Sequence, residues 1–208
     1  MKLFGKPKVG GDLKFYRLEG WWYSTLTESE RKTITTRFPA KVSGPSPDWT
    51  SANVSNFLWS WSTWFRKTPE ERAIARKMLT EAVVRARAEK TILDEHFSWG
   101  NLVEVWYRDR ELLPEALEQT IAACKAQIAI AAKTADAFRR EYQGHPVTVP
   151  PTHRGYEQLR IIYEKQKQYD EAIALVLDMQ RTGWADDVSA YVAKLTEKKA
   201  RTIGGRPK

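Results

Sequence analysis

The chain has 208 residues, with 34 Lys and Arg against 26 Asp and Glu, three His and one Cys. This length is enough to bury a core without disulfides or metal ions, and the lone Cys124 cannot form a disulfide within the chain. No apolar run approaches the roughly 18 to 20 residues that span a bilayer, and residues 1–11 lack the apolar middle of a secretory signal. We therefore expect a cytoplasmic protein without a membrane partner.

The formal net charge of +8 is concentrated in the first part of the chain. Residues 1–90 carry 17 basic and 9 acidic side chains, whereas residues 91–150 carry 6 and 9. Residues 1–12 have no periodic apolar face and predict a flexible basic arm. A basic excess attracts polyanions at low salt, so nucleic acid is one candidate partner for the N-terminal part.

Residues 13–38 predict a first pair of helices. LKFYRLEGWWYST begins the first helix, and a stop follows near Ser24. Thr27 and Glu30 then have the spacing of a capping box, in which each side chain accepts a hydrogen bond from the other residue's backbone amide. The second helix should run to about Phe38.

A connection and an aromatic helix follow the first pair. AKVSGPSPDW, residues 40–49, contains two prolines and a glycine and predicts an exposed connection. The next segment, NVSNFLWSWSTWFRK, places four aromatic residues on one helical stripe that we expect to be buried, namely Phe57, Trp61, Trp64 and Phe65. Trp59 lies away from this stripe. It is the expected surface anchor for a partner, because exposed Trp side chains are frequent interface hot spots.

A long basic helix is predicted over residues 69–89. Thr68 caps it, Pro69 occupies the first turn and Glu71 reaches back to the N-terminus. Its apolar face comprises Ile74, Met78, Leu79, Ala82 and Val83. Its candidate nucleic-acid contacts are Arg72, Arg76, Lys77, Arg85 and Arg87. An ordinary soluble surface is the alternative interpretation, because the chain has no evident reading-head motif such as a helix-turn-helix.

A third pair begins with a helix over residues 92–108. After a break around Pro114, a long alanine-rich helix follows, with a stripe of apolar residues at spacings of 4, 3 and 4, namely Leu117, Ile121, Cys124 and Ile128. Cys124 is expected to be a packed core residue, not a nucleophile. The segment QGHPVTVPP then interrupts the helical pattern, and Thr152 is the expected cap of the next helix.

The stretch from His153 to Trp184 predicts a fourth pair. It resembles a tetratricopeptide repeat, a helix-turn-helix unit of about 34 residues. The positions that match in order and spacing are Tyr156, Leu159, Tyr163, Tyr169, Ala172 and Ile173. The positions that depart from the repeat pattern are Arg160, Lys167, Met179 and Trp184. A short helix through Tyr191 and Leu195 follows, and residues 201–208 form a flexible basic tail.

The resemblance extends to the third pair, which is similar to a more divergent copy. Over residues 91–200 it implies antiparallel helix pairs stacked as a short TPR-like α-solenoid, a module found in many bacterial proteins. Residues 13–90 would then be Trp-rich, basic helical pairs that act as degenerate units or as a cap. No segment shows the alternation of a strand, so the fold class is all-α.

The same resemblance identifies a candidate partner site. In such arrays the first helix of each unit lines the concave surface, where an extended peptide or a helix binds. In the fourth pair the exposed face of that helix carries Arg154, Glu157, Ile161 and Lys165. Asn101 and Arg108 are the matching positions in the third pair. An ordinary solvated charged face is the alternative interpretation.

No pattern in the sequence predicts an enzyme, a cofactor or a metal site. Asp94, Glu95 and His96 are consecutive on a helix and point in different directions, so they cannot converge on one ion. His96 and His145 lack a second ligand at metal spacing, and His153 should pack at a helix end. We therefore predict a non-enzymatic adaptor that binds another protein or peptide. The alternatives are nucleic acid, bound by the basic N-terminal helices, and a second copy of the chain.

Overall fold

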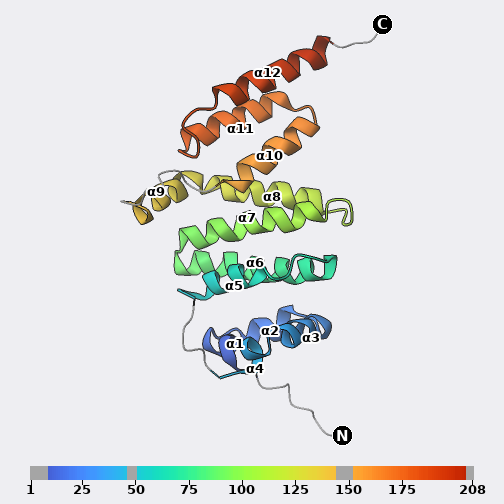
Figure 1. The fold of residues 1–208 in the computed structure, drawn as a ribbon, viewed down its shortest axis with the longest axis vertical. Helices are drawn as coiled ribbons and strands as arrows, with labels where there is room; N and C mark the ends of the chain where they lie inside the picture. Colours follow the sequence, from blue (N-terminus) through green and yellow to red (C-terminus); the bar gives the residue numbers. More distant parts are fainter. Residues whose placement is uncertain (1–8, 46–50, 144–151, 205–208) are drawn as a thin grey trace. The chain divides into compact units, whose positions relative to one another are not determined.

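The computed structural model describes residues 9–45, 51–143 and 152–204. Within these ranges every regular element is an α-helix, which confirms the predicted all-α class (Figure 1). The helices are α1 (Gly11–Phe15), α2 (Glu19–Thr25), α3 (Glu28–Arg37), α4 (Pro39–Ser43), α5 (Val54–Ser62), α6 (Pro69–Glu89), α7 (Ile92–Arg108), α8 (Ala116–Ala129), α9 (Ala131–Glu141), α10 (Arg154–Lys165), α11 (Tyr169–Arg181) and α12 (Ser189–Gly204). None of the described helices has the length and apolar character needed to cross a membrane.

The chain divides into two compact units, residues 1–85 and 86–208. The division falls within α6, close to residue 90, where the sequence suggests the boundary between the N-terminal pairs and the repeats. In the first unit, α4 packs against both α1 and α3. The core of that unit includes Leu13, Leu18, Trp22 and Ile34.

Local signals set the ends of α3. The Oγ1 atom of Thr27 accepts from the backbone amide of Glu30 at 3.3 Å, and Glu30 Oε2 accepts from the Thr27 amide at 2.7 Å. These two bonds are the predicted capping box, and they satisfy two amides that the helix itself leaves unpaired. The helix ends at Arg37 with Phe38 as its C-cap, close to the predicted end.

The expected connection over residues 40–49 is wrong in its first part. Residues 39–43 form α4, which Pro39 begins at the position where a missing amide hydrogen is tolerated. Val42 is buried, and its carbonyl accepts from the amide of Gly10 at 2.7 Å. Tertiary contact with α1 therefore stabilises α4, which is too short to be predicted from the sequence alone. Pro47 lies outside the described residues.

The aromatic stripe of α5 is confirmed in three of its four members. Phe57, Trp61 and Phe65 are buried, but the side chain of Trp64 is 58% exposed. The prediction for Trp64 is wrong because α5 ends at Ser62, so the chain no longer keeps the helical register that would turn Trp64 inward. Trp64 instead lies edge-on to Phe38, with 6.0 Å between ring centroids.

The predicted bounds and apolar face of α6 are confirmed. Ile74, Met78, Leu79, Ala82 and Val83 are all buried. At the N-terminus, Thr68 Oγ1 accepts from the amide of Glu71 at 3.2 Å. The Glu71 carboxylate reaches back one residue further than expected and accepts from the amide of Lys67 at 2.8 Å.

The second unit consists of adjacent packed helix pairs. α7 pairs with α8 and α10 pairs with α11, while α10 also packs on α7 and α8, and α12 packs on α11. The bounds of α7 agree with the prediction. The long alanine-rich helix is instead two helices, α8 and α9, which separate at Ile130. This break turns Phe138 toward α7, where its ring lies edge-on to Phe97 at 5.7 Å.

The start of α10 differs from the expected cap. Thr152 is exposed and makes no cap, whereas the His153 side chain is the N-cap, its Nδ1 accepting from the amide of Tyr156 at 3.3 Å. Histidine is an uncommon capping residue, so the sequence favours the neighbouring threonine. The repeat positions Tyr156, Leu159 and Ala172 are buried, as their place in the predicted packing requires.

The turn between α10 and α11 carries mild strain that a glycine would relieve. Lys167, which replaces the turn glycine of the repeat pattern, has a φ of 60°. A side chain in this left-handed conformation costs about 1 kcal/mol or more. We expect Lys167→Gly to raise the free energy of unfolding by about 0.5 to 1 kcal/mol in denaturant titrations. Lys125→Gly, at an exposed position inside α8, should lower it by about 1 kcal/mol. A destabilising Lys167→Gly would contradict this account.

Candidate partner-binding groove

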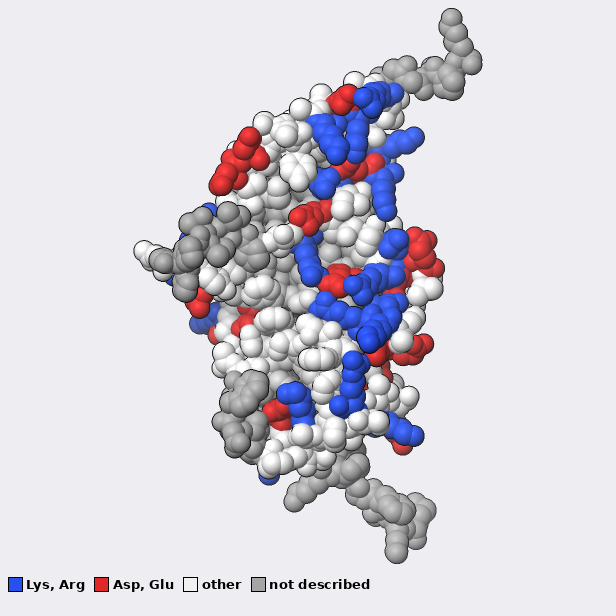
Figure 2. All heavy atoms as spheres, in the orientation of Figure 1, with Lys and Arg blue, Asp and Glu red and all other residues white. Residues whose placement is uncertain are grey.

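A groove of about 380 Å³ lies between α7 and α10 in the second unit. Its lining residues come from one face of each helix, namely Val103, Glu104, Tyr107 and Arg108 of α7 with Arg154, Glu157, Gln158 and Ile161 of α10. Val103 is buried, and Ile161 and Tyr107 are half-buried, so the floor is largely apolar. Four charged side chains and the Gln158 amide form the remainder of the lining. Over the second unit, the face drawn in Figure 2 likewise shows basic side chains lying among acidic ones.

One carboxylate joins the two walls of the groove. Glu104 Oε1 accepts from Arg108 Nη2 at 2.9 Å on the same helix, and its Oε2 pairs with Arg154 of α10. The Glu104 side chain is 17% exposed, while those of Arg108 and Arg154 are 51% and 46% exposed. Two accessible guanidinium groups therefore share one sheltered carboxylate.

A second link between the walls joins Lys165 to Tyr107. Lys165 Nζ donates to the Tyr107 hydroxyl at 3.0 Å. This hydrogen bond and the nearby positive charge lower the pKa of the Tyr107 phenol below its usual range, with a smaller contribution from Arg110. The Gln158 amide also lies beside that hydroxyl and contributes to the lowered pKa, yet its buried Nε2 makes no hydrogen bond of normal geometry.

The structure brings together most of the predicted partner-binding residues. Arg154, Glu157, Ile161 and Arg108 all line the groove, and Lys165 lies at Tyr107 beside it. Asn101 does not line the groove. It is buried, and its Nδ2 donates to the carbonyl of Phe97 at 2.7 Å.

Sequence reasoning missed the contribution of Glu104, Tyr107 and Gln158. All three follow the helical spacing of the predicted residues and could have been found by extending that face along each helix. Trp59 belongs to the first unit, where its side chain is half-buried, and the exposed tryptophan of that region is Trp64.

A smaller cavity of about 50 Å³ lies among α10, α11 and α12. Its lining comprises Tyr156, Glu157, Arg160, Leu175, Val176, Met179 and Tyr191. Glu157 thus borders both cavities. Its carboxylate is exposed and makes no ion pair or hydrogen bond with the described residues, so it is available to a ligand in either place.

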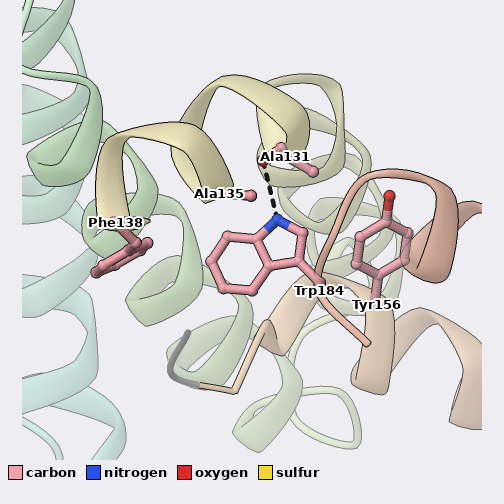
Figure 3. Close-up of a cluster of buried hydrophobic side chains, with 5 residues drawn as sticks. All are labelled: Ala131, Ala135, Phe138, Tyr156 and Trp184. Carbon is pink, nitrogen blue, oxygen red and sulfur yellow. Dashed lines mark hydrogen bonds between the residues drawn. The ribbon is translucent and has the colours of Figure 1, made fainter. Parts of the chain in front are cut away.

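Behind the groove, Trp184 closes a buried cluster (Figure 3). The cluster consists of Ala131, Ala135, Phe138, Tyr156 and Trp184. Trp184 is 8% exposed, and its Nε1 donates to the Ala131 carbonyl at 2.9 Å. The chain that follows α11 is thereby fastened to the start of α9.

Two buried histidines pack against the Trp184 indole. The His96 ring is stacked on it with 4.9 Å between centroids, and the His153 ring meets it edge-on at 4.6 Å. The centroids of the two imidazole rings are 5.0 Å apart. Burial lowers the pKa of His96 to about 4, and burial together with the neighbouring His96 lowers that of His153 to about 3. Both rings are therefore neutral at pH 7.

Gln127 joins three helices at this place. Its Nε2 donates to the His96 carbonyl of α7 at 3.0 Å, and its Oε1 accepts from the Gly155 amide of α10 at 2.7 Å. A Cβ atom at Gly100 would lie 2.8 Å from Gln127 Nε2, and one at Gly155 would lie 2.9 Å from its Oε1. A side chain at Gly100 would therefore displace the Gln127 amide, and one at Gly155 would also meet the Cys124 backbone carbonyl at 2.9 Å, so α10 could not approach α8 this closely.

The five basic candidates for nucleic-acid contact are held by other parts of the protein. Arg72 is buried and donates to the carbonyls of Arg66 and Lys67. Three others form ion pairs, namely Lys77 with Glu30, Arg85 with Glu81 and Arg87 with Glu95. Arg76 is half-buried. Lys77, Arg85 and Arg87 are thus paired within the chain, as Arg108 and Arg154 of the groove are, and the nucleic-acid interpretation stays a prediction.

The described residues contain no group of three or more His, Cys, Asp or Glu that could hold a metal ion. Cys124 is buried, and burial raises the pKa of its thiol to about 12, so it is not a reactive thiolate at neutral pH. His145 lies outside the described residues. The chain matches no protein-family model, and neither a curated protein nor a solved structure shows significant similarity to it.

Proposed function

We propose that this protein is a non-enzymatic interaction module that binds a segment of another protein in the groove between α7 and α10. The observation that carries the proposal is the lining of that groove, an apolar floor with accessible charges on both walls. A groove of about 380 Å³ accommodates a few side chains of an extended or helical segment, which is the scale of peptide recognition.

The packing of the second unit supports a TPR-like α-solenoid as the framework of this site. α7 and α10 are the first helices of successive pairs and lie against each other, so their outward faces form one surface. In the clearest unit, the buried Tyr156 and Leu159 of the first helix accompany the small buried Ala172 of the second. This combination of large and small residues is the packing that such repeats use.

The charges of the groove suggest how a partner would be held. Arg108, Arg154 and Lys165 present accessible cations, and the accessible carboxylate is Glu157, because Glu104 is sheltered between two arginines. A partner segment with acidic side chains would meet the three cations, while its apolar side chains cover Tyr107 and Ile161. Exposed charge pairs of this kind are screened by salt, so binding should weaken as ionic strength rises.

Charge reversal on one wall of the groove tests the proposal. We expect Arg154→Glu combined with Lys165→Glu to weaken partner binding at least tenfold, because both changes repel the acidic groups that the cations attract. The tagged full chain is used to capture partners from a lysate of its source organism. Binding of each recovered partner is then measured by titration calorimetry.

The matched control reverses two cations away from the groove, Lys125 on α8 and Lys133 on α9, both of which are exposed. Circular dichroism and denaturant unfolding establish that all variants are folded. If the groove variant and the control retain the same partners with the same affinities, the groove is not the binding site.

A further inference from the structure

The hydrogen bonds of His96 and His153 fix which ring nitrogen of each carries its proton. His96 Nε2 lies 3.3 Å from Gln127 Nε2, an amide nitrogen that can only donate, so His96 Nε2 accepts and its proton is on Nδ1. His153 Nδ1 accepts from the Tyr156 amide at 3.3 Å, so its proton is on Nε2. Both protonated nitrogens, His96 Nδ1 and His153 Nε2, are buried, and neither makes a hydrogen bond of normal geometry with the described residues, although the Gln127 backbone near His153 raises the pKa of that ring slightly.

A second proton can therefore bind only where the ring already accepts a structural hydrogen bond. On His153 the second proton would occupy Nδ1, so this nitrogen could no longer accept from the Tyr156 amide and α10 would lose its N-cap. On His96 the second proton would occupy Nε2 and point at the N–H groups of Gln127 Nε2, so the Gln127 side chain would be repelled. The Oε1 atom of that side chain accepts from the Gly155 amide. Either protonation acts on the first turn of α10.

We propose that His96 and His153 form an acid-sensitive latch, which holds the first turn of α10 against α7 and α8 and releases it when either ring is protonated. The proposal concerns regulation of the α7–α10 groove and so rests on the proposed function. Arg154 and Glu157, which line the groove, follow His153 directly within that turn. Release of the turn removes both side chains from their places on the groove wall.

The position of His153 makes protonation doubly unfavourable in the closed structure. The N-terminus of a helix carries a partial positive charge from its unpaired amides, so an imidazolium at the N-cap is repelled. The loss of an N-cap acceptor by itself typically changes the stability of a helix end several-fold. The closed structure therefore excludes the proton, and protonation favours the open one.

Among the residues that the structure describes, no charged group next to the rings is hydrogen-bonded to either imidazole. On α7, Asp94 and Glu95 are buried beside His96, and the Glu95 carboxylate binds Arg87 and Trp99 Nε1. On α10, Arg154 is paired with Glu104. α8 contributes the neutral Gln127 and Cys124, since the pKa of that thiol is raised.

In the described part of α9, α11 and the connection to α12, the charged groups near the cluster are bound to other partners. α9 presents Ala131, Ala135 and Phe138 to Trp184, while its Asp136 and Arg139 pair with each other. On α11, the Asp178 carboxylate accepts from Tyr156 Oη at 2.6 Å and pairs with Arg181. The connection from α11 to α12 contributes the Trp184 indole. The Asp187 carboxylate in this connection accepts from the backbone amide of Ser189.

The direction of the pH dependence follows from these neutral rings. In the released state each histidine regains an ordinary pKa of about 6.5. Above that pH both states are neutral and the latch is fully closed. As the pH falls from about 6.5 toward 4, the released state binds protons that the closed state excludes. The ratio of open to closed molecules then rises by up to about tenfold per pH unit for each histidine.

Amide hydrogen exchange in the full chain tests the latch without a ligand. Exchange is followed by NMR at pH 7.5 and pH 5.0 and corrected for the intrinsic pH dependence of exchange. We expect the protection of the Gly155 and Tyr156 amides to fall at least tenfold at the lower pH, while Ile74 in the first unit changes little. Unchanged protection of Gly155 and Tyr156 in the wild type would overturn the proposal.

Variants that cannot titrate provide the controls. His153→Asn supplies a capping oxygen in place of a titratable ring, and its α10 amides should lose less protection at pH 5.0 than those of the wild type, because only His96 still titrates there. If this variant is unfolded at pH 7.5, His153→Ser takes its place. His96→Phe is the matching change at the other histidine, because it removes the titratable group and keeps a ring against Trp184. An equal fall in a folded capping variant and in the wild type would refute the role of His153. If the groove variant retains the partners of the control in the capture experiment, the groove is not the binding site. The exchange measurement would still test the latch, because it uses no partner.

Discussion

Replacing Trp184 with alanine is expected to lower the free energy of unfolding of the second unit by about 3 to 5 kcal/mol. The substitution removes a buried indole from a cluster to which α7, α9 and α10 all contribute. It also leaves the Ala131 carbonyl without the hydrogen bond from Trp184 Nε1. The loss is therefore mainly that of the cavity, because the Ala131 carbonyl still accepts from Thr134 Oγ1 at 2.9 Å.

Denaturant unfolding monitored by hydrogen exchange measures this loss, because the exchange data resolve the two units separately. Trp64→Ala is the matched control, since the Trp64 side chain is 58% exposed. Its removal should change stability by no more than about 1 kcal/mol. Equal effects of the two substitutions would show that Trp184 does not close the core of the second unit.

Gln127→Leu is expected to cost about 2 to 4 kcal/mol. Leucine has a similar size, so the main effect is electrostatic. The Gly155 amide loses its partner while it stays buried, which costs about 1 to 3 kcal/mol, and the His96 carbonyl keeps its bond within α7 but loses a second one, which costs about 1 kcal/mol. The measurement is the midpoint and slope of urea unfolding of the full chain.

The control for Gln127→Leu is Gln119→Leu, on the exposed face of the same helix. It should change stability by less than about 0.5 kcal/mol. A loss of similar size in both variants would mean that leucine disturbs α8 itself, and the three-helix contact at Gln127 would not be responsible.

Sequence signals that act over a few residues predicted the fold well. The capping box of α3, the start of α6 at Pro69 and the apolar face of α6 all depend on neighbours along the chain, and the structure confirms them. The same local logic failed for α4 and for the break between α8 and α9. Both depend on contacts with distant residues, α4 with α1 and Phe138 with Phe97.

The groove was predicted more fully on the α10 side than on the α7 side, where Arg108 was predicted and lines it but Asn101 is buried. The spacing of Arg154, Glu157 and Ile161 marked the exposed face of α10, and the structure places all three in the lining. The ion pair between Arg154 and Glu104 requires the register of α10 on α7, which helical periodicity does not contain. Likewise, Gln127 reads as one more polar residue of an alanine-rich helix, because its buried position depends on two glycines in other helices.

The sharing of Glu104 between Arg108 and Arg154 has a consequence for how a ligand would be selected. In the free protein Glu104 already serves as the counter-ion of both arginines, so an incoming acidic group exchanges one ion pair for another. Such an exchange contributes little net free energy, but it is possible only for a group that reaches both guanidinium groups. The apolar floor would then set the strength of binding, while the charges set the direction in which a bound segment runs.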